Sequence, residues 1–329
     1  MNLASTYMGF NLPHPLIPGA SPLADDLDKV RQLEDAGAPM IVMHSLFEEQ
    51  ITSEQLAMRR SMEAGVDSFA EALTYLPDPH DFTLGPDEYL EQVRKIKAAV
   101  SVPVIGSLNG TTLGGWLTYA RLIKEAGADG LELNLYELAT DLSETGEQVE
   151  ERSLQVVRTV RRAVRFPIAV KLSPFYSSIA NFAAKLDRLG VDAILLFNRF
   201  YQPDIDVEQL EVLRVNLSSQ AELLLRLRWL AMLSGRVRAS LGATGGVHSA
   251  VDAVKAVMAG AHGVQMVSAL LQRGPAYLRQ VRDDLERWLE QHEYESLAQM
   301  QGSMSLLRCD NPKMYERTNY IRILQSWEF

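Results

Sequence analysis

The stretch LELNLYEL, residues 131–138, carries two carboxylates and an amide within one apolar run. Side chains alternate along a strand, so Glu132 and Asn134 share one face while the leucines share the other. The run IAVKLSP, residues 168–174, places Lys171 between apolar neighbours in the same way. A buried lysine needs a charged partner or a ligand. We therefore expect these three polar side chains to face one interior, either as an internal Glu132–Lys171 ion pair or as part of a binding site.

Glycines with anion-binding potential occur late in the chain. The run LGATGGVHS, residues 241–249, places Gly245 and Gly246 between a predicted strand and a predicted helix. Glycines allow close backbone approach to an anion, and the N–H groups at a helix start donate to it. The next unit offers Ser268 at a second helix start in SALLQRGP. The two segments together predict a phosphate site, whereas the glycines alone would also suit a tight turn.

A second amide ends another apolar run, in LLFNRFYQPD at residues 195–204. Asn198 lies there at the level that Asn134 occupies in its own strand. Two amides at strand ends suit a planar ligand with hydrogen-bonding edges. The alternative is that both asparagines only form turns.

Recurring corners reveal the elements that position these residues. Each corner follows an amphipathic run and precedes a short apolar one, and glycine suits the left-handed position just past a helix. The glycine corners are AGAP at 36–39, AGADG at 126–130, LGVDA at 189–193 and AGAHG at 259–263. Pro103, Pro167 and Gly235 mark three more. These corners predict eight βα units, with strands near 15–20, 40–44, 103–107, 130–135, 168–172, 192–197, 237–241 and 262–267.

Eight alternating βα units predict an α/β protein with a (β/α)8 TIM barrel. Phosphate sites in such barrels commonly follow strands 7 and 8, where Gly245 and Ser268 fall. A doubly wound open sheet is the alternative architecture. Long loops after strands 2, 4 and 6, the longest at 44–86 with a helix expected at 48–60, would supply lid and substrate contacts. We expect residues 1–291 to form the barrel, with 1–14 as an N-terminal cap, and 292–329 to form a tail packed on it.

Composition narrows the functional class. The 329-residue chain has a net charge of −10 and no stripe of basic residues, which argues against a nucleic-acid partner. It has no apolar run of membrane-spanning length. A single cysteine and an N-terminus without signal-peptide features predict a cytoplasmic protein without disulfides. Six histidines without close spacing predict no metal site, and one cysteine predicts no protein-held iron–sulfur cluster.

The motifs resemble the class 1 FMN-dependent dihydroorotate dehydrogenases and the related flavin domain of dihydropyrimidine dehydrogenase. The similarity spans most of the predicted barrel. The matching segments are ASP at 20–22, PVIGSLNG at 103–110, LELNL at 131–135, AVKLSP at 169–174, FNR at 197–199, ATGGV at 243–247 and SAL at 268–270.

The resemblance implies a bound FMN, oxidation of dihydroorotate to orotate in pyrimidine biosynthesis, and a homodimer. It implies that the FMN phosphate is held by Gly245, Gly246 and Ser268, and that the isoalloxazine ring is lined by Ala20 and Ser21. Lys171 would sit at the N1/O2 edge of that ring, where an ammonium stabilises the negative charge of reduced flavin. Asn134 and Asn198 would bind a planar, dihydropyrimidine-like substrate, with Asn134 also reaching the cofactor.

The sequence departs from the family pattern mainly around the substrate. Glu137 stands where the family has a catalytic Cys or Ser base, and Ala139 replaces a second substrate-binding asparagine. His44 replaces a lysine after strand 2, and Val267 replaces the glycine before Ser268. We expect weak dihydroorotate oxidation, whether Glu137 is a desolvated base for another substrate or is solvated or paired with an arginine.

Two further functions stay open from the sequence. In a lyase or aldolase acting on a phosphorylated substrate, Lys171 would form a Schiff base. In a flavin-binding barrel without catalysis, the same residues would hold FMN for a structural or regulatory role.

Overall fold

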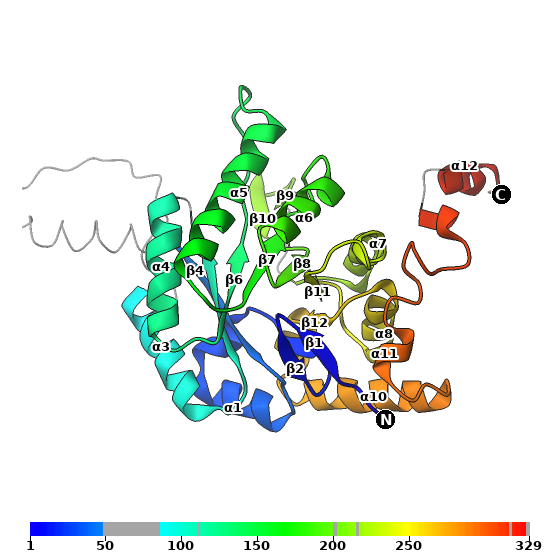
Figure 1. Ribbon diagram of the computed structural model, residues 1–329, viewed down its shortest axis with the longest axis horizontal. Coiled ribbons are helices and arrows are strands. Elements are labelled where there is room, and N and C mark those ends of the chain that lie inside the picture. Colours follow the sequence, from blue (N-terminus) through cyan, green and yellow to red (C-terminus); the bar gives the residue numbers. More distant parts are fainter. Residues whose placement is uncertain (49–85, 111, 200–202, 215–216, 316–317, 327–329) are drawn as a thin grey trace, which may run out of the picture.

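The computed structural model describes residues 1–48, 86–110, 112–199, 203–214, 217–315 and 318–326. Eight parallel strands form one sheet that curls into a nearly closed barrel, with the order β3-β12-β11-β8-β7-β6-β5-β4. Figure 1 shows helices around the outside of this sheet. The predicted (β/α)8 TIM barrel is confirmed. The helix expected at 48–60 lies almost entirely outside the described residues.

The strands fall close to the predicted positions. They are β3 (Leu16–Pro18), β4 (Ile41–Phe47), β5 (Val104–Asn109), β6 (Gly130–Asn134), β7 (Ile168–Leu172), β8 (Ala193–Leu196), β11 (Ser240–Thr244) and β12 (Gly263–Met266). The strand predicted at 237–241 is shifted by three residues, and this part of the prediction was wrong. The N–H groups of Arg238 and Ala239 donate to the Asp187 carboxylate, each at 2.9 Å, so the ladder with β8 begins only at Ser240.

The helices begin and end where local chemistry favours it. Ser249 caps α8 and accepts from the backbone of Asp252, whose carboxylate returns the contact in a capping box. Gly127 and Gly190 follow α4 and α6 with φ of 100° and 77°, a region that glycine enters without strain. The barrel helices are α1 (Leu27–Asp35), α3 (Pro86–Ala99), α4 (Leu113–Glu125), α5 (Gly146–Ala163), α6 (Ile179–Arg188), α7 (Leu223–Leu233), α8 (Ala250–Ala259), α9 (Ser268–Arg273) and α10 (Tyr277–Gln291).

The barrel floor is closed by the antiparallel hairpin of β1 (Ser5–Tyr7) and β2 (Phe10–Leu12). Tyr7 lies beneath β11 and β12, where a Cβ added to Gly242 or Gly263 would come within 2.8 or 2.9 Å of its ring or hydroxyl. Tyr7 joins one inner apolar cluster with Met8, Leu12, Ile17, Met40, Val42, Ile105, Ala169 and Ala193. Because the floor is apolar and filled, the polar interior is confined to the upper part of the barrel.

The segment after α10 runs along the outside of the barrel. It contains α11 (Leu297–Met300), η4 (Pro312–Tyr315) and α12 (Thr318–Gln325). Met304 N donates to Met258 O at 2.8 Å and Leu306 N to Ala231 O at 2.9 Å, so this stretch packs on α8 and α7. None of the described helices is long and apolar enough to cross a membrane.

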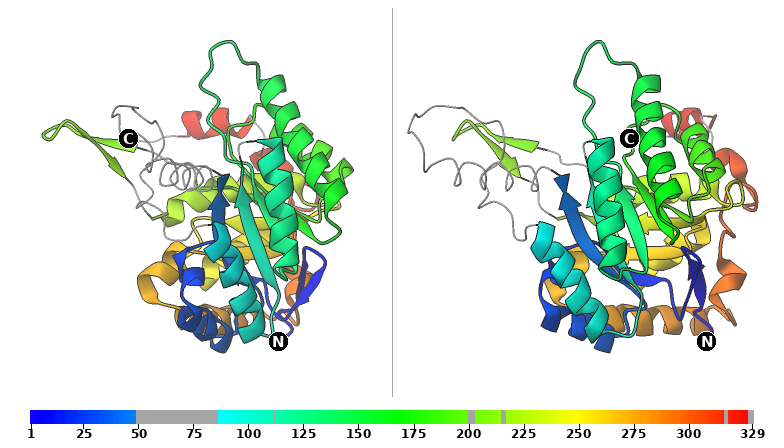
Figure 2. Two further views of the ribbon diagram at one scale, coloured as in Figure 1. Left: turned by 90° about the vertical axis from the view of Figure 1, so that its left-hand side faces the viewer. Right: turned by 60° about the vertical axis from the view of Figure 1, so that its left-hand side comes forward.

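A two-stranded ribbon, β9 (Pro203–Asp206) with β10 (Glu211–Arg214), follows β8. Figure 2 shows it projecting away from the body of the barrel. Ile205 and Val212 are cross-strand partners and are both strongly exposed, at 67% and 63%.

Candidate functional site

A polar layer crosses the barrel above the apolar floor. Lys171 Nζ on β7 donates to Glu132 Oε1 on β6 at 2.6 Å, and Gln265 Nε2 on β12 donates to Glu132 Oε2 at 2.8 Å. All three side chains are buried. Both carboxylate oxygens therefore have a partner, as a buried charge requires. The internal ion pair, one of the two alternatives that strand alternation left open, is present, and it fixes Lys171 Nζ in the barrel.

Three amide atoms around this layer have no partner. Within the described part of the chain, Asn109 Nδ2, Asn134 Oδ1 and Gln265 Oε1 are buried and make no hydrogen bond. A buried polar atom without a partner costs about 1–3 kcal/mol, so such atoms normally face a ligand or water. These atoms mark the place where a hydrogen-bonding ligand would fit. Asn109 and Gln265 were missed by sequence reasoning, although PVIGSLNG and GVQMV place each on the inner side of its strand.

The other predicted residues of the barrel mouth come from adjacent strand ends. Asn134 is the ladder partner of Lys171, and the backbone N–H of Asn198 donates to Leu172 O at 2.8 Å. Asn134 and Lys171 lie level with Leu195 of β8, and Asn198 follows three residues later, so it lies above the level that the sequence predicted for it. Ala20 packs on the inner apolar cluster and Ser21, directly after β3, is buried.

The glycine segment forms a cradle of donors. Gly245 and Gly246 have φ of 89° and 81°, and a Cβ on Gly246 would lie 2.4 Å from Leu223 N. Gly246 N donates to Ser218 Oγ at 3.3 Å, and Ser218 Oγ lies 2.8 Å from Ser268 Oγ. N–H and hydroxyl donors that converge in this way suit a phosphate oxygen. Ser218 was not predicted, because it follows a loop without periodicity.

A buried arginine lies directly behind this cradle. Arg226 of α7 donates to Thr244 O at 2.9 Å and to Glu222 O at 2.6 Å, and a Cβ on Gly245 would lie 2.8 Å from its Nη2. Burial lowers the pKa of Arg226 from its ordinary value. Its charge adds attraction for an anion at the glycines. The run LLLRLRWL does not reveal this role, since arginines within a helical repeat are usually exposed.

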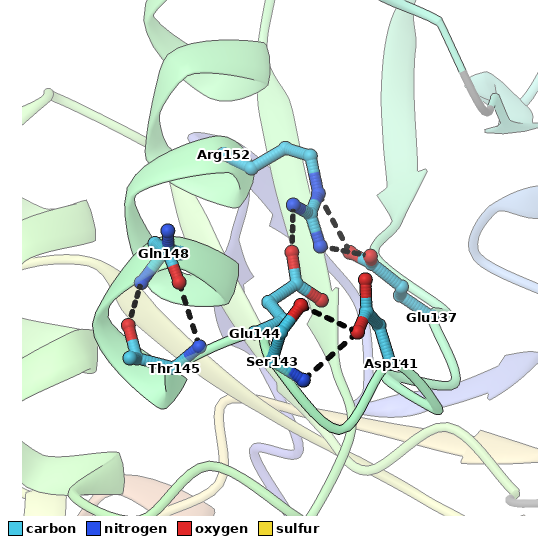
Figure 3. A network of polar contacts seen from close by, with 7 residues as sticks. All are labelled: Glu137, Asp141, Ser143, Glu144, Thr145, Gln148 and Arg152. Atoms are coloured by element: carbon cyan, nitrogen blue, oxygen red, sulfur yellow. Dashed lines mark hydrogen bonds and ion pairs between the residues drawn. The ribbon is translucent and has the colours of Figure 1, made fainter.

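The loop after β6 is braced by an arginine. Figure 3 shows Arg152 of α5 between the carboxylates of Glu137 and Glu144. Asp141 accepts from the N–H and hydroxyl of Ser143 at 2.8 and 2.7 Å, which fixes the turn before α5. Hydrogen bonds from Arg152 lower the pKa of Glu144 below its ordinary value.

The same contact decides where Glu137 points. Its side chain is 40% exposed and its carboxylate contacts the guanidinium of Arg152. Of the two arrangements considered from the sequence, the structure has the arginine-paired one, which lacks a desolvated carboxylate at this position.

An apolar cavity of about 370 Å³ adjoins the braced loop. Ala139 lines it, so the position of the missing amide is part of an apolar wall. Burial raises the pKa of Tyr176, another wall residue, to about 12, so this phenol stays neutral at physiological pH. The lining residues are Glu137, Leu138, Ala139, Val149, Ser173, Phe175 and Tyr176.

His44 of β4 meets Asp25 of η1 (Pro22–Asp25), the turn that follows β3. Its Nδ1 forms an ion-pair contact with Asp25 Oδ1. The ring stands edge-on to Tyr89 of α3, with centroids 5.1 Å apart and planes at 89°. Sequence reasoning noted His44 as a departure from the family but did not connect it with Asp25.

Comparison with known proteins places the chain in a family. The family model described as "Dihydroorotate dehydrogenase" matches residues 83–289, which contain six of the eight barrel strands. The chain belongs to the dihydroorotate dehydrogenase family. This agrees with the resemblance that the sequence motifs indicated.

Relatives within this family are distant. A putative dihydroorotate dehydrogenase A (fumarate) of Aeropyrum pernix is 31% identical over 208 residues, which cover 61% of this chain and 67% of the relative. The catalytic subunit of a dihydroorotate dehydrogenase B (NAD(+)) of Geobacter is 29% identical over 231 residues, or 68% and 75% of the two chains. Its counterpart in Thermoplasma acidophilum is 24% identical over 310 residues, or 92% and 98%. At such identities the fold is shared, while the substrate has to be argued from the site.

Proposed function

We propose that this protein is an FMN-dependent oxidoreductase that oxidises a CH–CH bond in a small planar ring compound, and that dihydroorotate is a poor substrate for it. The observation that carries the proposal is the set of unpartnered amide atoms on Asn109, Asn134 and Gln265 beside the fixed ammonium of Lys171. A flat ligand with alternating donors and acceptors would satisfy them. Flavins and dihydropyrimidines both have such edges.

The cradle fits the phosphate of FMN. Gly245, Gly246 and Ser268 would hold it, with Ser218 as an additional hydroxyl and Arg226 as the charge behind them. Ala20 and Ser21 would line the ring, and Asn134 would reach its polar edge. When bound, FMN supplies a two-electron acceptor for hydride. The ammonium of Lys171, held by Glu132, would stabilise negative charge at that ring without reorganisation.

The residues around the proposed substrate site favour a substrate other than dihydroorotate. Asn134 and Asn198 remain available to orient a planar ring, whereas position 139 is apolar. Glu137 and Glu144 share one arginine, so this group carries a net negative charge. Such a wall repels the carboxylate of dihydroorotate and favours a neutral ring with an apolar substituent.

The cofactor assignment is tested by mass spectrometry of the ligand released on heating, together with the flavin absorbance of the purified protein. We expect FMN. The double variant Ser218→Ala with Ser268→Ala should lose most of it, whereas Ser303→Ala, far from the cradle in the C-terminal segment, should retain it. Release of FAD, or of no flavin from well-folded parent protein, would show that the assignment is wrong.

The two other functions have distinct signatures. A Schiff base needs a Lys171 Nζ that is free to attack a carbonyl, and Glu132 holds this nitrogen in a buried contact, so borohydride should trap no carbonyl substrate on this residue. A flavin-binding barrel without catalysis would keep its colour in every anaerobic substrate screen. Bleaching by any planar ring compound therefore supports the oxidoreductase.

A further inference from the structure

A cavity lies at the opposite end of the barrel from the proposed flavin site. Its volume is about 330 Å³, and its lining comes from the corner before β11, the corner before β12, α11 and the segment that follows α11. Ala239 lines it just before β11, whereas Gly245 follows the same strand. At a rise of about 3.3 Å per residue, the strand separates the two places by about 20 Å. The cavity is therefore distinct from the glycine cradle.

The lining of this cavity is basic. Arg238, Arg308 and His262 contribute to it, and none of the described residues that line it is acidic. The whole chain has a net charge of −10, so a local excess of positive charge departs from the rest of its surface. Asp187 contacts Arg238 from outside the lining, with 3.5 Å between Oδ2 and Nε. An ion pair at so exposed a side chain is weak, and the Nη groups of Arg238 remain for a ligand.

The imidazole of His262 adds a neutral donor. Its Nδ1 accepts a hydrogen bond from Leu241 N at 3.1 Å, so the hydrogen of the neutral ring lies on Nε2. Burial lowers the pKa of His262 below its ordinary value, which keeps the ring neutral at physiological pH. The N–H at Nε2 is therefore the donor that this residue can offer to a ligand.

Two hydroxyl groups approach Gly302 in the same lining. A Cβ added to Gly302 would lie 3.0 Å from Ser234 Oγ and 4.0 Å from Ser305 Oγ. Ser305 is buried, with 2% of its surface exposed. The guanidinium of Arg308 is held beside them, because its Nη1 donates to Gln301 O at 3.3 Å. Hydroxyl and guanidinium donors from separate segments thus surround one space.

We propose that this cavity binds a small organic anion through a carboxylate or phosphate group. A guanidinium forms paired hydrogen bonds with either group, and the hydroxyl and imidazole donors would bind the remaining oxygens. The apolar side chains of Val237 and Leu307, which also line the cavity, would contact the carbon part of the ligand. A cavity of this volume suits a metabolite. The proposal depends neither on flavin binding nor on turnover.

The first test follows the side chain of His262 by nitrogen NMR. Protein with labelled histidine is titrated with inorganic phosphate or with succinate, at constant ionic strength and with FMN present in excess to fill the cradle. The resonance of His262 is assigned from its loss in His262→Gln. We expect it to change in a saturable way, with half-saturation at about 1 mM or below, as in ordinary metabolite sites. His292, which does not line the cavity, should stay unchanged.

The two anions distinguish the ligand groups. A response to phosphate alone supports a phosphate ester as the ligand, and a response to succinate alone supports a carboxylate. A response to both supports a site for either group. An equal response to sodium chloride, or no response to either anion in the millimolar range, would overturn the proposal.

The second test measures the affinity of the stronger anion by calorimetry. Arg238→Gln and Arg308→Gln should each weaken binding about 10–100-fold, because each removes a charge-assisted hydrogen bond. Arg236→Gln is the matched control, since this arginine is in the same corner but does not line the cavity, and its Nη1 donates to Met232 O at 3.2 Å. All three arginines are exposed, so the variants should keep the parent fold. Unchanged affinity in both cavity variants, or an equal loss in Arg236→Gln, would rule out this site.

Discussion

At the scale of a residue, the main departure from the family is Glu137, which stands at the position of the catalytic Cys or Ser. A thiol has a reference pKa of about 8.5 and a glutamate one of about 4.3, so a carboxylate at position 137 starts with roughly four units less proton affinity. In the structure the Glu137 side chain is 40% exposed and its carboxylate contacts the guanidinium of Arg152. Glu137 therefore stabilises the loop after β6 through its ion pair with Arg152, and it is not placed to act as a base.

We expect stopped-flow measurements to show slow flavin reduction by dihydroorotate in the parent protein. The double variant Glu137→Cys with Ala139→Asn should be faster, because it restores a stronger base and an amide and frees the loop from Arg152. Ala139→Asn alone serves as the control for the amide. Reduction in the parent at ordinary turnover rates, about 1–10³ s⁻¹, would contradict our interpretation of this loop.

A buried histidine far from the mouth predicts a pH dependence of stability. Burial lowers the pKa of His14 from 6.5 to about 4, while its Nε2 lies 2.8 Å from Gly37 O. A histidine with a lowered folded pKa stabilises the protein above pH 6.5 and loses that contribution as the pH falls toward 4. We expect a loss of about 2 kcal/mol in the free energy of unfolding between pH 7 and pH 5.

Urea unfolding at both pH values measures this loss. His14→Gln should reduce the difference between pH 7 and pH 5, and His292→Gln, at an exposed position, should not. Equal pH dependence in the parent and in His14→Gln would rule out His14 as the cause.

At the scale of elements, the stability of the barrel depends on the ion pair that the neighbouring strands β6 and β7 form in its interior. In the ladder between the neighbouring strands β6 and β7, Glu132 lies two residues before the partner of Lys171, and the two side chains meet inside the barrel above the apolar floor. Removing one partner of a buried ion pair costs about 3–5 kcal/mol, because the other charge stays buried alone. Stability and the proposed flavin chemistry would therefore depend on the same pair.

We expect Lys171→Ala to lower the free energy of unfolding by about 3–5 kcal/mol and to weaken FMN retention. The double variant Lys171→Met with Glu132→Gln should recover much of the stability without recovering the retention, since it removes both charges. Urea unfolding and flavin content measure the two effects. A single variant as stable as the parent would mean that the ion pair does not hold this part of the barrel.

The strand positions could be predicted from the sequence because each helix-to-strand turn is determined by residues within the turn itself. Gly127 and Gly190 meet a backbone requirement that few other residues satisfy, and strand alternation placed Glu132 and Lys171 inside. The start of β11 could not be predicted, because the residues before it donate their backbone N–H groups to Asp187 of α6, which belongs to a different βα unit. Ser218, Arg226 and Asp25 were missed for the same reason: their roles arise from contacts with residues distant in sequence.

At the scale of the whole molecule, the β9–β10 ribbon presents different chemistry on its two faces. Ile205 and Val212 share one face, and Asp206 lies opposite Glu211 on the other. An isolated two-stranded ribbon is marginally stable in water, and exposed apolar faces commonly mark protein contacts. A second copy of the chain is the partner that we expect on its apolar face.

Sedimentation velocity tests this expectation. The parent should sediment as a homodimer, and Ile205→Asp should shift it toward the monomer because a charge would enter the apolar contact. Asp206→Asn, on the other face, is the matched control. A monomeric parent, or a dimer unaffected by Ile205→Asp, would exclude this face as the contact.

The hairpin below the barrel has a consequence for synthesis on the ribosome. Tyr7 packs against Gly242 and Gly263, and β3 has its ladder partner in β12, so these partners are made more than 200 residues later. Contacts so distant in sequence form late, after most of the loop-closure entropy has been lost. The nascent chain must therefore keep the β1–β2 hairpin and β3 without these partners until translation has passed Met266. During that interval these apolar segments are natural targets for a chaperone.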